Sequence, residues 1–430
     1  MSVYSARVVS IRDTGRLFAR EWRGLLAPFC MDLSWGLFGL GLPLFLKQQF
    51  ALDETGVAWV NAVGWLSYLG LCPVFGRLAD RGWRSRQLLA APPVALMALA
   101  AVASSRPAWG LWQVYIGILI YYVASAMFWP SLITTISQSR DSGRVLRRIT
   151  VFNSAWIAGY CVGSQLAGVL NHLHYAYPFF GCAFFMLLLL PVVVHTDRHH
   201  RTTALEEPHP TPGMTLPNIV RRRRMLWIAW VALFFATAGI VTARTLYPVT
   251  AVDLGLGSTR IGLLMLLTGL GQWSGFLLGG LFPRWWYYRF WPLAVAQMAM
   301  VAACTALGLV THYPVLILAM AAAGFGASIP YLMSITYGTI GSDNPGVKSG
   351  IHEALIGAGA LAGPLFVSQI AGALFPVSSH SRGIYLLASA LAAAALIAQL
   401  VMFAAMRRAE RSAVSATPLA PIGAEEALRQ

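Results

Sequence analysis

The sequence predicts an all-α polytopic membrane protein in which twelve transmembrane helices form two six-helix pseudo-repeats. Hydrophobic residues occupy 57% of its 430 positions and charged residues only 11%, and the mean hydropathy is +0.63. A soluble core of this length needs far less apolar material, so lipid is the expected solvent. Two further observations support this prediction. The chain contains apolar windows of roughly 20 residues, the length that crosses a bilayer, and the second half repeats a pattern of the first.

Twelve apolar windows predict the helices in chain order. The first half holds windows at 25–46, 56–77, 87–104, 110–137, 150–170 and 175–195. The second half holds windows at 225–248, 259–282, 290–311, 314–340, 350–373 and 383–406. They predict two helical bundles, 25–195 and 224–406, joined by a cytoplasmic linker at 196–223 and followed by a cytoplasmic tail at 407–430. Residues 1–24 carry five arginines and are predicted as a basic amphipathic segment on the membrane surface.

The net charge of +15 is explained by topology. An N-terminus in the cytoplasm places every Lys and Arg on the cytoplasmic side except Lys47, Arg106, Arg244, Arg260 and Arg382. This asymmetry is the positive-inside rule, so we expect both termini in the cytoplasm and an integral protein of the bacterial inner (plasma) membrane. Nucleic acid is therefore not an expected partner.

Cysteine and histidine give little sign of a metal site. The five cysteines each lie singly in an apolar window, which favours buried thiols over disulfides or metal ligands. The linker histidines are irregularly spaced among prolines, which favours a solvated linker. We expect no metal and no cofactor.

The second half copies the first at an offset near 200 residues, as internal repeats do. Three helix positions recur at an offset of 200, namely Pro130, Gly159 and Gly163 as Pro330, Gly359 and Gly363. At an offset of 205, Pro43 corresponds to Pro248. The duplication predicts two like-oriented halves.

A short charged hairpin lies between the second and third windows. It reads Gly76, Arg77, Leu78, Ala79, Asp80, Arg81, Gly82, Trp83, Arg84, Ser85, Arg86. It resembles the loop between helices two and three of the major facilitator superfamily, with Gly76, Leu78, Ala79, Asp80 and Arg81 in register. Trp83 and Ser85 depart from the family pattern, which has glycine and a basic residue there. The resemblance implies two six-helix halves with a solute path between them near the bilayer midplane.

The resemblance also implies a gate at the cytoplasmic end of the halves. Gly76, Asp80 and Arg81 would engage the start of span eleven and the 140–148 loop, which carries Arg144 and Arg148. A carboxylate at that helix N-terminus gains roughly 1 to 2 kcal/mol from the dipole and from hydrogen bonds. Glu353 lies near the predicted start of the same span, where it belongs to the gate or caps the helix.

Asp32 stands out as an acid well inside a predicted span, where a charge costs on the order of 3 kcal/mol. It shares a helix face with Trp35, Gly39 and Pro43. This face is predicted to line a cavity in which Asp32 exchanges protons; the alternative is a structural hydrogen bond to a neighbouring helix.

Arg244 lies within the seventh span and stands where the first half has Gly39, at an offset of 205. Its charge is therefore not part of the duplicated scaffold. It attracts an anionic solute, pairs with an acid across the cavity, or extends its head toward the interface.

Polar and aromatic side chains at membrane depth suit a pocket for a ring-bearing or amphipathic solute. The remaining candidates of this kind are Trp35, Asn61, Tyr121, Trp129, Gln272 and Tyr331. Small residues spaced four apart, which let helices approach closely as a rocking interface requires, are expected to pack spans five and eleven. They are Gly159, Gly163, Gly359, Gly363 and Pro364.

The leading interpretation is a secondary active transporter that moves a small-molecule substrate by alternating access, coupled to protons through Asp32. A metal or metal-complex transporter of the same fold, for example for iron, is one alternative. A non-transporting sensor or assembly partner that kept the fold is another. Phosphate-binding Gly-Lys motifs, catalytic triads and zinc spacings are missing from the sequence, so we expect no enzyme. We expect a monomer in the lipid bilayer.

Overall fold

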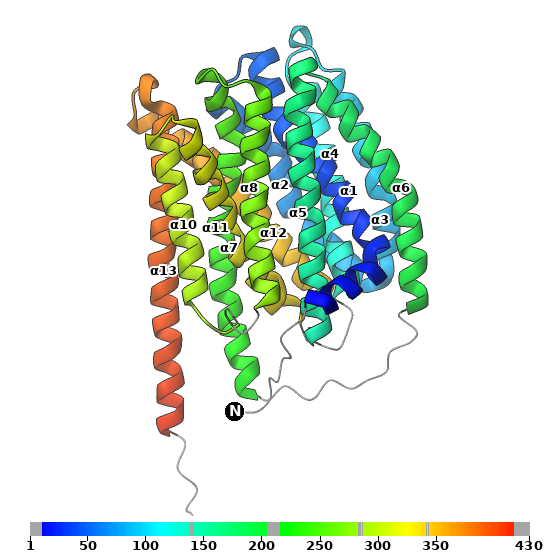
Figure 1. The fold of residues 1–430 in the computed structure, drawn as a ribbon, viewed down its shortest axis with the longest axis vertical. Helices are drawn as coiled ribbons and strands as arrows, with labels where there is room; N and C mark the ends of the chain where they lie inside the picture. The colour runs from blue at the N-terminus through cyan, green and yellow to red at the C-terminus, as the bar shows by residue number, and fades with distance from the viewer. Residues whose placement is uncertain are drawn as a thin grey trace, which may run out of the picture.

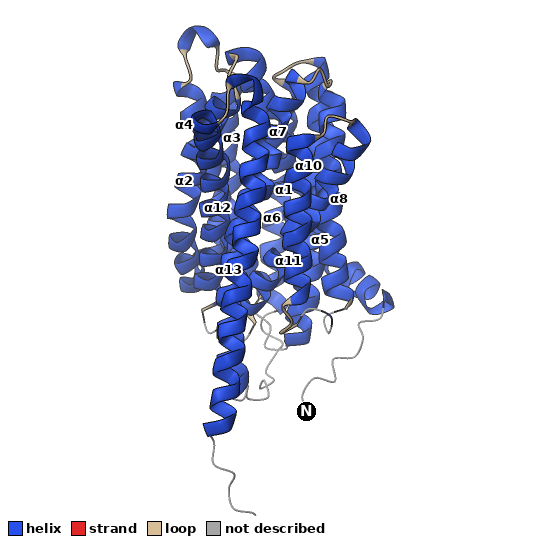
Figure 2. Ribbon diagram, turned by 90° about the vertical axis from the view of Figure 1, so that its left-hand side faces the viewer, coloured by secondary structure: helices blue, strands red, loops and turns tan. Residues whose placement is uncertain are grey.

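The computed structural model describes residues 11–137, 142–203, 216–282, 285, 287–340, 342 and 344–416. Within these ranges Figure 2 shows only helices and loops. Six long helices come from the first half of the chain: α1 (Ile11–Phe50), α2 (Glu54–Leu78), α3 (Arg84–Ala103), α4 (Trp112–Ile136), α5 (Ser142–Leu173) and α6 (Tyr177–Thr203). Six more come from the second: α7 (Leu216–Asp253), α8 (Ser258–Leu281), α10 (Trp291–Leu309), α11 (Tyr313–Thr339), α12 (Pro345–Leu374) and α13 (His380–Ala416).

These helices are long and apolar enough for a membrane protein. Ten stretches of the described chain meet the length and hydropathy that a membrane crossing needs, and one of them, Glu54–Ala103, runs through both α2 and α3. α5 is outside these ten because it carries more polar residues. It packs between α1 and α8. The arrangement is consistent with twelve crossings.

The helices group as an N-terminal half, α1–α6, and a C-terminal half, α7–α13. Within the halves α1 packs on α5 and α7 packs on α12, and the halves meet along α2 with α12 and along α5 with α8. α1 begins and α13 ends at the same end of the bundle (Figure 1). We call this the hairpin end, because the α2–α3 turn, Ala79–Trp83, also lies there.

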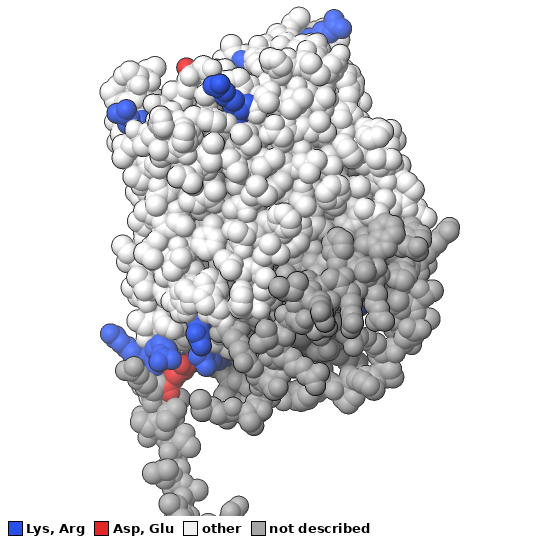
Figure 3. All heavy atoms as spheres, in the orientation of Figure 1, with Lys and Arg blue, Asp and Glu red and all other residues white. Residues whose placement is uncertain are grey.

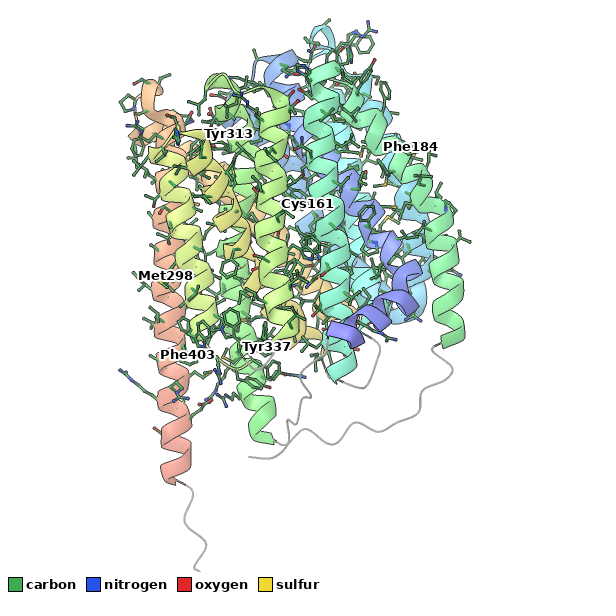
Figure 4. All side chains as sticks on the ribbon, viewed as in Figure 1. Cys161, Phe184, Met298, Tyr313, Tyr337 and Phe403 are labelled. Carbon is green, nitrogen blue, oxygen red and sulfur yellow. The ribbon has the colours of Figure 1, made fainter. Side chains whose placement is uncertain are left out.

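The surface has the charge distribution of a membrane protein. On the face in Figure 3, a wide band without Lys, Arg, Asp or Glu separates charged groups at the two ends of the described atoms. Phe184 on α6 and Met298 on α10 point outward at the flanks (Figure 4), and they are 56% and 52% exposed. Apolar side chains this exposed are suited to contact lipid tails rather than water.

The α2–α3 turn departs from the family pattern but still reverses the chain. α2 and α3 meet at a kink within Ala79–Trp83, where Gly82 takes a non-helical φ of +88°. Glycine adopts this left-handed conformation without the steric cost that other residues have. Gly82, one position before Trp83 where the family pattern has glycine, is therefore the residue at which the backbone turns.

Several helices run beyond the predicted boundaries. Residues 11–24 continue directly into the first span as one helix, α1, although the sequence predicts a separate surface segment. α6 extends to Thr203, α7 begins at Leu216 and α13 extends to Ala416, so helix replaces parts of the predicted linker and tail. The rest of the linker, the first ten residues and the last fourteen lie outside the described residues.

The predicted small-residue stripes pack inside each half. A Cβ at Gly159 or Gly163 would collide with the α1 backbone at Phe29 and Leu33. Gly359 and Gly363 approach the α7 backbone in the same way, and Pro364 is buried beside them in α12. These close approaches fit the predicted helix-packing role, and both helix pairs lie within one half.

Other glycines form the contacts between the halves. At the hairpin end Gly76 of α2 lies against Gly346 and Gly350 of α12. Gly168 of α5 lies against Gly262 of α8 toward the opposite end. Glycines at these positions let the backbones of the two halves approach closely.

Candidate functional site

A cavity of about 150 Å³ lies between the two halves. The N-terminal half lines it with Asp32, Trp35, Phe38, Gly39, Asn61, Trp65, Tyr68, Tyr122, Trp129, Trp156 and Tyr160. The C-terminal half lines it with Leu233, Thr237, Ile240, Val241, Arg244, Thr245, Gln272, Ala327, Tyr331, Glu353 and Ile356. All of these residues lie in the interiors of helices, so the cavity is at membrane depth.

The N-terminal half supplies an aromatic wall. Tyr122 lies edge-on to Trp35 and to Trp65, with ring centroids 5.0 Å and 4.8 Å apart. Trp65 in turn lies edge-on to Tyr68 at 5.6 Å. Rings that hold one another in this geometry form a rigid apolar surface against which a further ring can pack.

Arg244 is the cation of the cavity. Its Nη2 donates to Oε1 of Gln272 on α8 at 2.7 Å. The guanidinium carbon lies 4.1 Å from the ring centroid of Tyr160 on α5, within the range of a cation–π contact. Arg244 also interacts electrostatically with Asp32 across the cavity. Because Gln272 and Tyr160 hold the group in the cavity, the alternative of an arginine extended toward the interface is wrong.

Two acids face the same cavity, Asp32 from α1 and Glu353 from α12, and they are 5% and 4% exposed. The Tyr68 hydroxyl of α2 donates to Oε2 of Glu353 at 2.6 Å, a short bond of the charge-assisted kind. Glu353 lies two turns inside α12, so the helix-cap interpretation is wrong. This bond joins the two halves directly beside the cavity.

The structure brings most of the predicted pocket residues together. Those that line the cavity are Asp32, Trp35, Asn61, Trp129, Arg244, Gln272 and Tyr331. Tyr121 instead lies behind the wall, where its ring stacks on Phe38 at 4.1 Å and on Trp35 at 5.4 Å. Its buried hydroxyl lies 3.3 Å from Oγ of Ser34, so it supports Trp35 and does not face the cavity.

Sequence reasoning missed Trp156 and Tyr160 of α5 as lining residues. They are four apart in a helix, so they share one face, and both are buried against the C-terminal half. Trp156 lies 5.4 Å from the rings of Phe276 and Tyr331. The i, i+4 spacing of two aromatics was the available signal.

At the hairpin end, Asp80 bridges the halves. Its Oδ1 and Oδ2 accept from the backbone N–H groups of Gly346 and Val347 at 2.7 Å and 2.8 Å. These are among the first N–H groups of α12, and Asn344 at its N-cap position makes no side-chain capping bond. Asp80 therefore caps α12 from the other half of the molecule. We call this contact the hairpin latch.

The other residues predicted for the gate do not all lie at this latch, and Glu353 lines the cavity instead. Gly76 is in direct contact with α12, and Arg81 is exposed in the turn. Arg148 is half-buried near the start of α5. The side chain of Arg144 lies outside the described part of the structure. Ser349 of α12 adds a bond to the α4 carbonyl of Pro130 at 3.2 Å.

The halves are also joined at the opposite end, through contacts that we call the outer latch. The buried Glu54 at the start of α2 accepts from Oγ1 of Thr250 on α7 at 2.9 Å and from Oγ of Ser381 on α13 at 2.6 Å. Lys47 of α1 pairs with Asp253 of α7 at 2.9 Å. Bonds between the halves therefore exist on both sides of the cavity.

Metal ligation finds no support in the described residues, since they contain no group of three His, Cys, Asp or Glu side chains arranged to hold an ion. His352 is buried, with Nδ1 2.8 Å from Oγ of Ser334 and its ring edge-on to Tyr331 at 4.7 Å. It packs behind the cavity.

A sequence profile of the Major Facilitator Superfamily matches residues 24–364. The 3-(3-hydroxy-phenyl)propionate transporter of Escherichia coli (strain K12) is 26% identical over 380 residues, which cover 85% of this chain and 88% of that protein. The crystal structure of the nucleoside transporter NupG superimposes with a TM-score of 0.64 at 14% identity, covering 89% of this chain and 98% of NupG. The human organic anion transporter MFSD10 (TETRAN) gives 0.60 at 17% identity, covering 88% and 98%.

Proposed function

The chain belongs to the major facilitator superfamily of membrane transporters, and we propose that it carries a small aromatic carboxylate across the membrane together with protons by alternating access. The observation that carries the proposal is the cavity, in which one held cation, Arg244, faces an aromatic wall. Guanidinium groups bind carboxylates with geometric specificity, and aromatic walls bind rings. The relative from Escherichia coli transports an acid of this chemistry, as its name states.

The size of the cavity supports a substrate with a single ring. Its volume is about 150 Å³, and an apolar cavity of about this volume is known to hold benzene. A carboxylate on a short chain would reach Arg244 while the ring packs against the wall that Trp65 and Tyr122 form. Two-ring acids would require the cavity to widen.

Proton coupling is proposed for the two acids of the cavity. An acid at membrane depth is costly to charge unless a cation or a hydrogen-bond donor compensates. Arg244 compensates Asp32 and Tyr68 compensates Glu353. An anion that binds Arg244 competes with Asp32 for the cation, so proton uptake at Asp32 would accompany substrate binding. This exchange supplies the coupling.

Alternating access is supported by the two latches. The hairpin latch and the outer latch join the same halves on opposite sides of the cavity. Opening one while the other stays formed would expose the cavity to one side of the membrane at a time. We propose cytoplasmic termini in a bacterial inner membrane, so the hairpin latch closes the cytoplasmic side, and the transporter is proposed to work as a monomer.

The test is proton flux in proteoliposomes that contain a pH-sensitive dye. Adding 3-phenylpropionate to the wild-type protein is expected to drive proton movement. Asp32→Asn is expected to abolish this movement while radiolabelled substrate still exchanges across the membrane, because binding survives without coupling. Asp53→Asn, which removes a carboxylate outside the cavity, is the matched control and should keep wild-type flux.

Other outcomes separate the alternatives. Substrate exchange without proton movement in the wild-type protein would contradict coupling but retain transport. Uptake of an iron chelate in place of aromatic acids would favour the metal-complex alternative. A folded protein that moves no solute in the panel would favour the sensor.

A further inference from the structure

Gly39 leaves an open space in the wall of the cavity, and the packing of α1 does not require this space. It lies in the interior of α1 and lines the cavity, and a Cβ built on it would find no heavy atom within 4 Å. Gly36, one turn earlier, is different: its Cβ would lie 2.7 Å from the Tyr160 carbonyl oxygen and 2.8 Å from the Ser164 nitrogen. Packing therefore requires glycine at position 36 but not at position 39.

Backbone conformation gives no reason for glycine at position 39 either. The positive-φ glycines of the described chain are Gly82, Gly110 and Gly255, so Gly39 has ordinary helical geometry. A glycine inside a helix costs about 0.5 to 1 kcal/mol relative to alanine. The space beside Gly39 is thus kept at a cost to the stability of α1.

The internal repeat shows what this position can hold. Arg244 of α7 stands 205 residues after Gly39, and both residues line the cavity. At equivalent positions, the C-terminal half therefore supplies an arginine, the longest cationic side chain, whereas the N-terminal half supplies a glycine, which has no side chain. A substrate with a charged end and a bulky end matches that difference.

We infer that Gly39 is the position that sets the size of the substrate, with the carboxylate at Arg244 and the far end of the ring or chain in the space beside Gly39. The inference rests on the proposed function, because it assumes an aromatic carboxylate in this cavity. It assigns a specificity role to a residue that makes no polar contact. A side chain at position 39 fills the space and excludes longer substrates first.

The experiment measures binding of benzoate, 3-phenylpropionate and 4-phenylbutyrate by calorimetry to the purified full chain in nanodiscs. Gly39→Leu is expected to weaken the binding of 4-phenylbutyrate about tenfold or more while the binding of benzoate changes much less, because even one methylene in an apolar pocket is worth about tenfold or more. Gly39→Ala should shift the same ratio in the same direction by a smaller factor, with a melting temperature at or above that of the wild type.

Gly70→Leu is the matched control. Gly70 of α2 also has no heavy atom within 4 Å of a built Cβ, but it is exposed on the outer face and does not line the cavity. The Gly70→Leu variant should bind the three acids with the same relative affinities as the wild type. If wild-type protein binds none of the three acids, the proposed substrate class is wrong.

If the wild type binds these acids and the Gly39 variants keep its selectivity, the assignment of Gly39 is overturned while the proposed function stands. Should Gly39→Leu not fold, the ratio measured for Gly39→Ala decides the question in the same way.

Discussion

The hairpin latch predicts that Asp80→Asn opens the hairpin end of the molecule. The carboxylate holds two N–H groups of α12 at once, at 2.7 Å and 2.8 Å. An amide has one oxygen, so the variant keeps at most one of these bonds and loses the charge that the helix dipole favours. Asp80 is exposed, which places the loss at about 1 to 2 kcal/mol, below that of a buried charged bond.

A loss of about 1 to 2 kcal/mol changes the equilibrium between the closed and open hairpin end by about 5- to 30-fold. Cys72 reports this change. It is fully buried in α2, and its carbonyl lies beside Gly350 in the contact between α2 and α12. With the other four cysteines replaced by alanine, its reaction with N-ethylmaleimide should be several-fold faster in Asp80→Asn than in the parent.

Asp53→Asn provides the control for this measurement. Asp53 also caps a helix with its carboxylate, accepting from the Gly56 nitrogen at 2.8 Å, but it lies within one half at the opposite end. Its substitution should leave the labelling of Cys72 unchanged. Equal labelling rates in the parent and in folded Asp80→Asn would refute the reasoning that this carboxylate holds the halves together.

Three further substitutions have defined outcomes. Gly82→Ala should lower the melting temperature by a few degrees, because alanine at a φ of +88° costs about 1 kcal/mol. Arg244→Lys should weaken 3-phenylpropionate binding at least tenfold in calorimetry despite the retained charge, since a lysine lacks the planar group that stacks on Tyr160; unchanged affinity would contradict the carboxylate site. Gly163→Leu should abolish the folded monomer peak in size-exclusion chromatography, because its side chain meets the backbone of Leu33; a stable monomer would contradict the packing argument.

The fold was largely predictable because lipid constrains sequence strongly. Apolar windows, the internal repeat and the hairpin around Asp80 each have a local physical cause that one sequence reveals. Boundaries were less predictable: residues 11–24 and 404–416 are polar enough to leave the membrane, yet they remain helical in α1 and α13. Helix formation needs only local hydrogen bonds, so it does not end where apolar composition ends.

Site residues were predictable from the sequence where a charged side chain lies inside a membrane span, because a charge at that depth is energetically costly. Asp32 and Arg244 stand out because charges in a span need a partner or a cavity, and both line the cavity. Glu353 was misplaced because the start of α12 was predicted five residues late, at 350 in place of Pro345. Tyr121 was misplaced because depth along a helix does not fix the direction in which a side chain points.

Under the proposed alternating access, the two latches would also set how long a bound substrate stays. A molecule between them would leave only after one latch had opened, so its dissociation rate would not exceed the opening rate of the weaker latch. Substrates of different affinity would then share a similar upper bound on dissociation. In such a carrier the residence time is a property of Asp80, Glu54 and their partners as much as of the contacts that the substrate itself makes.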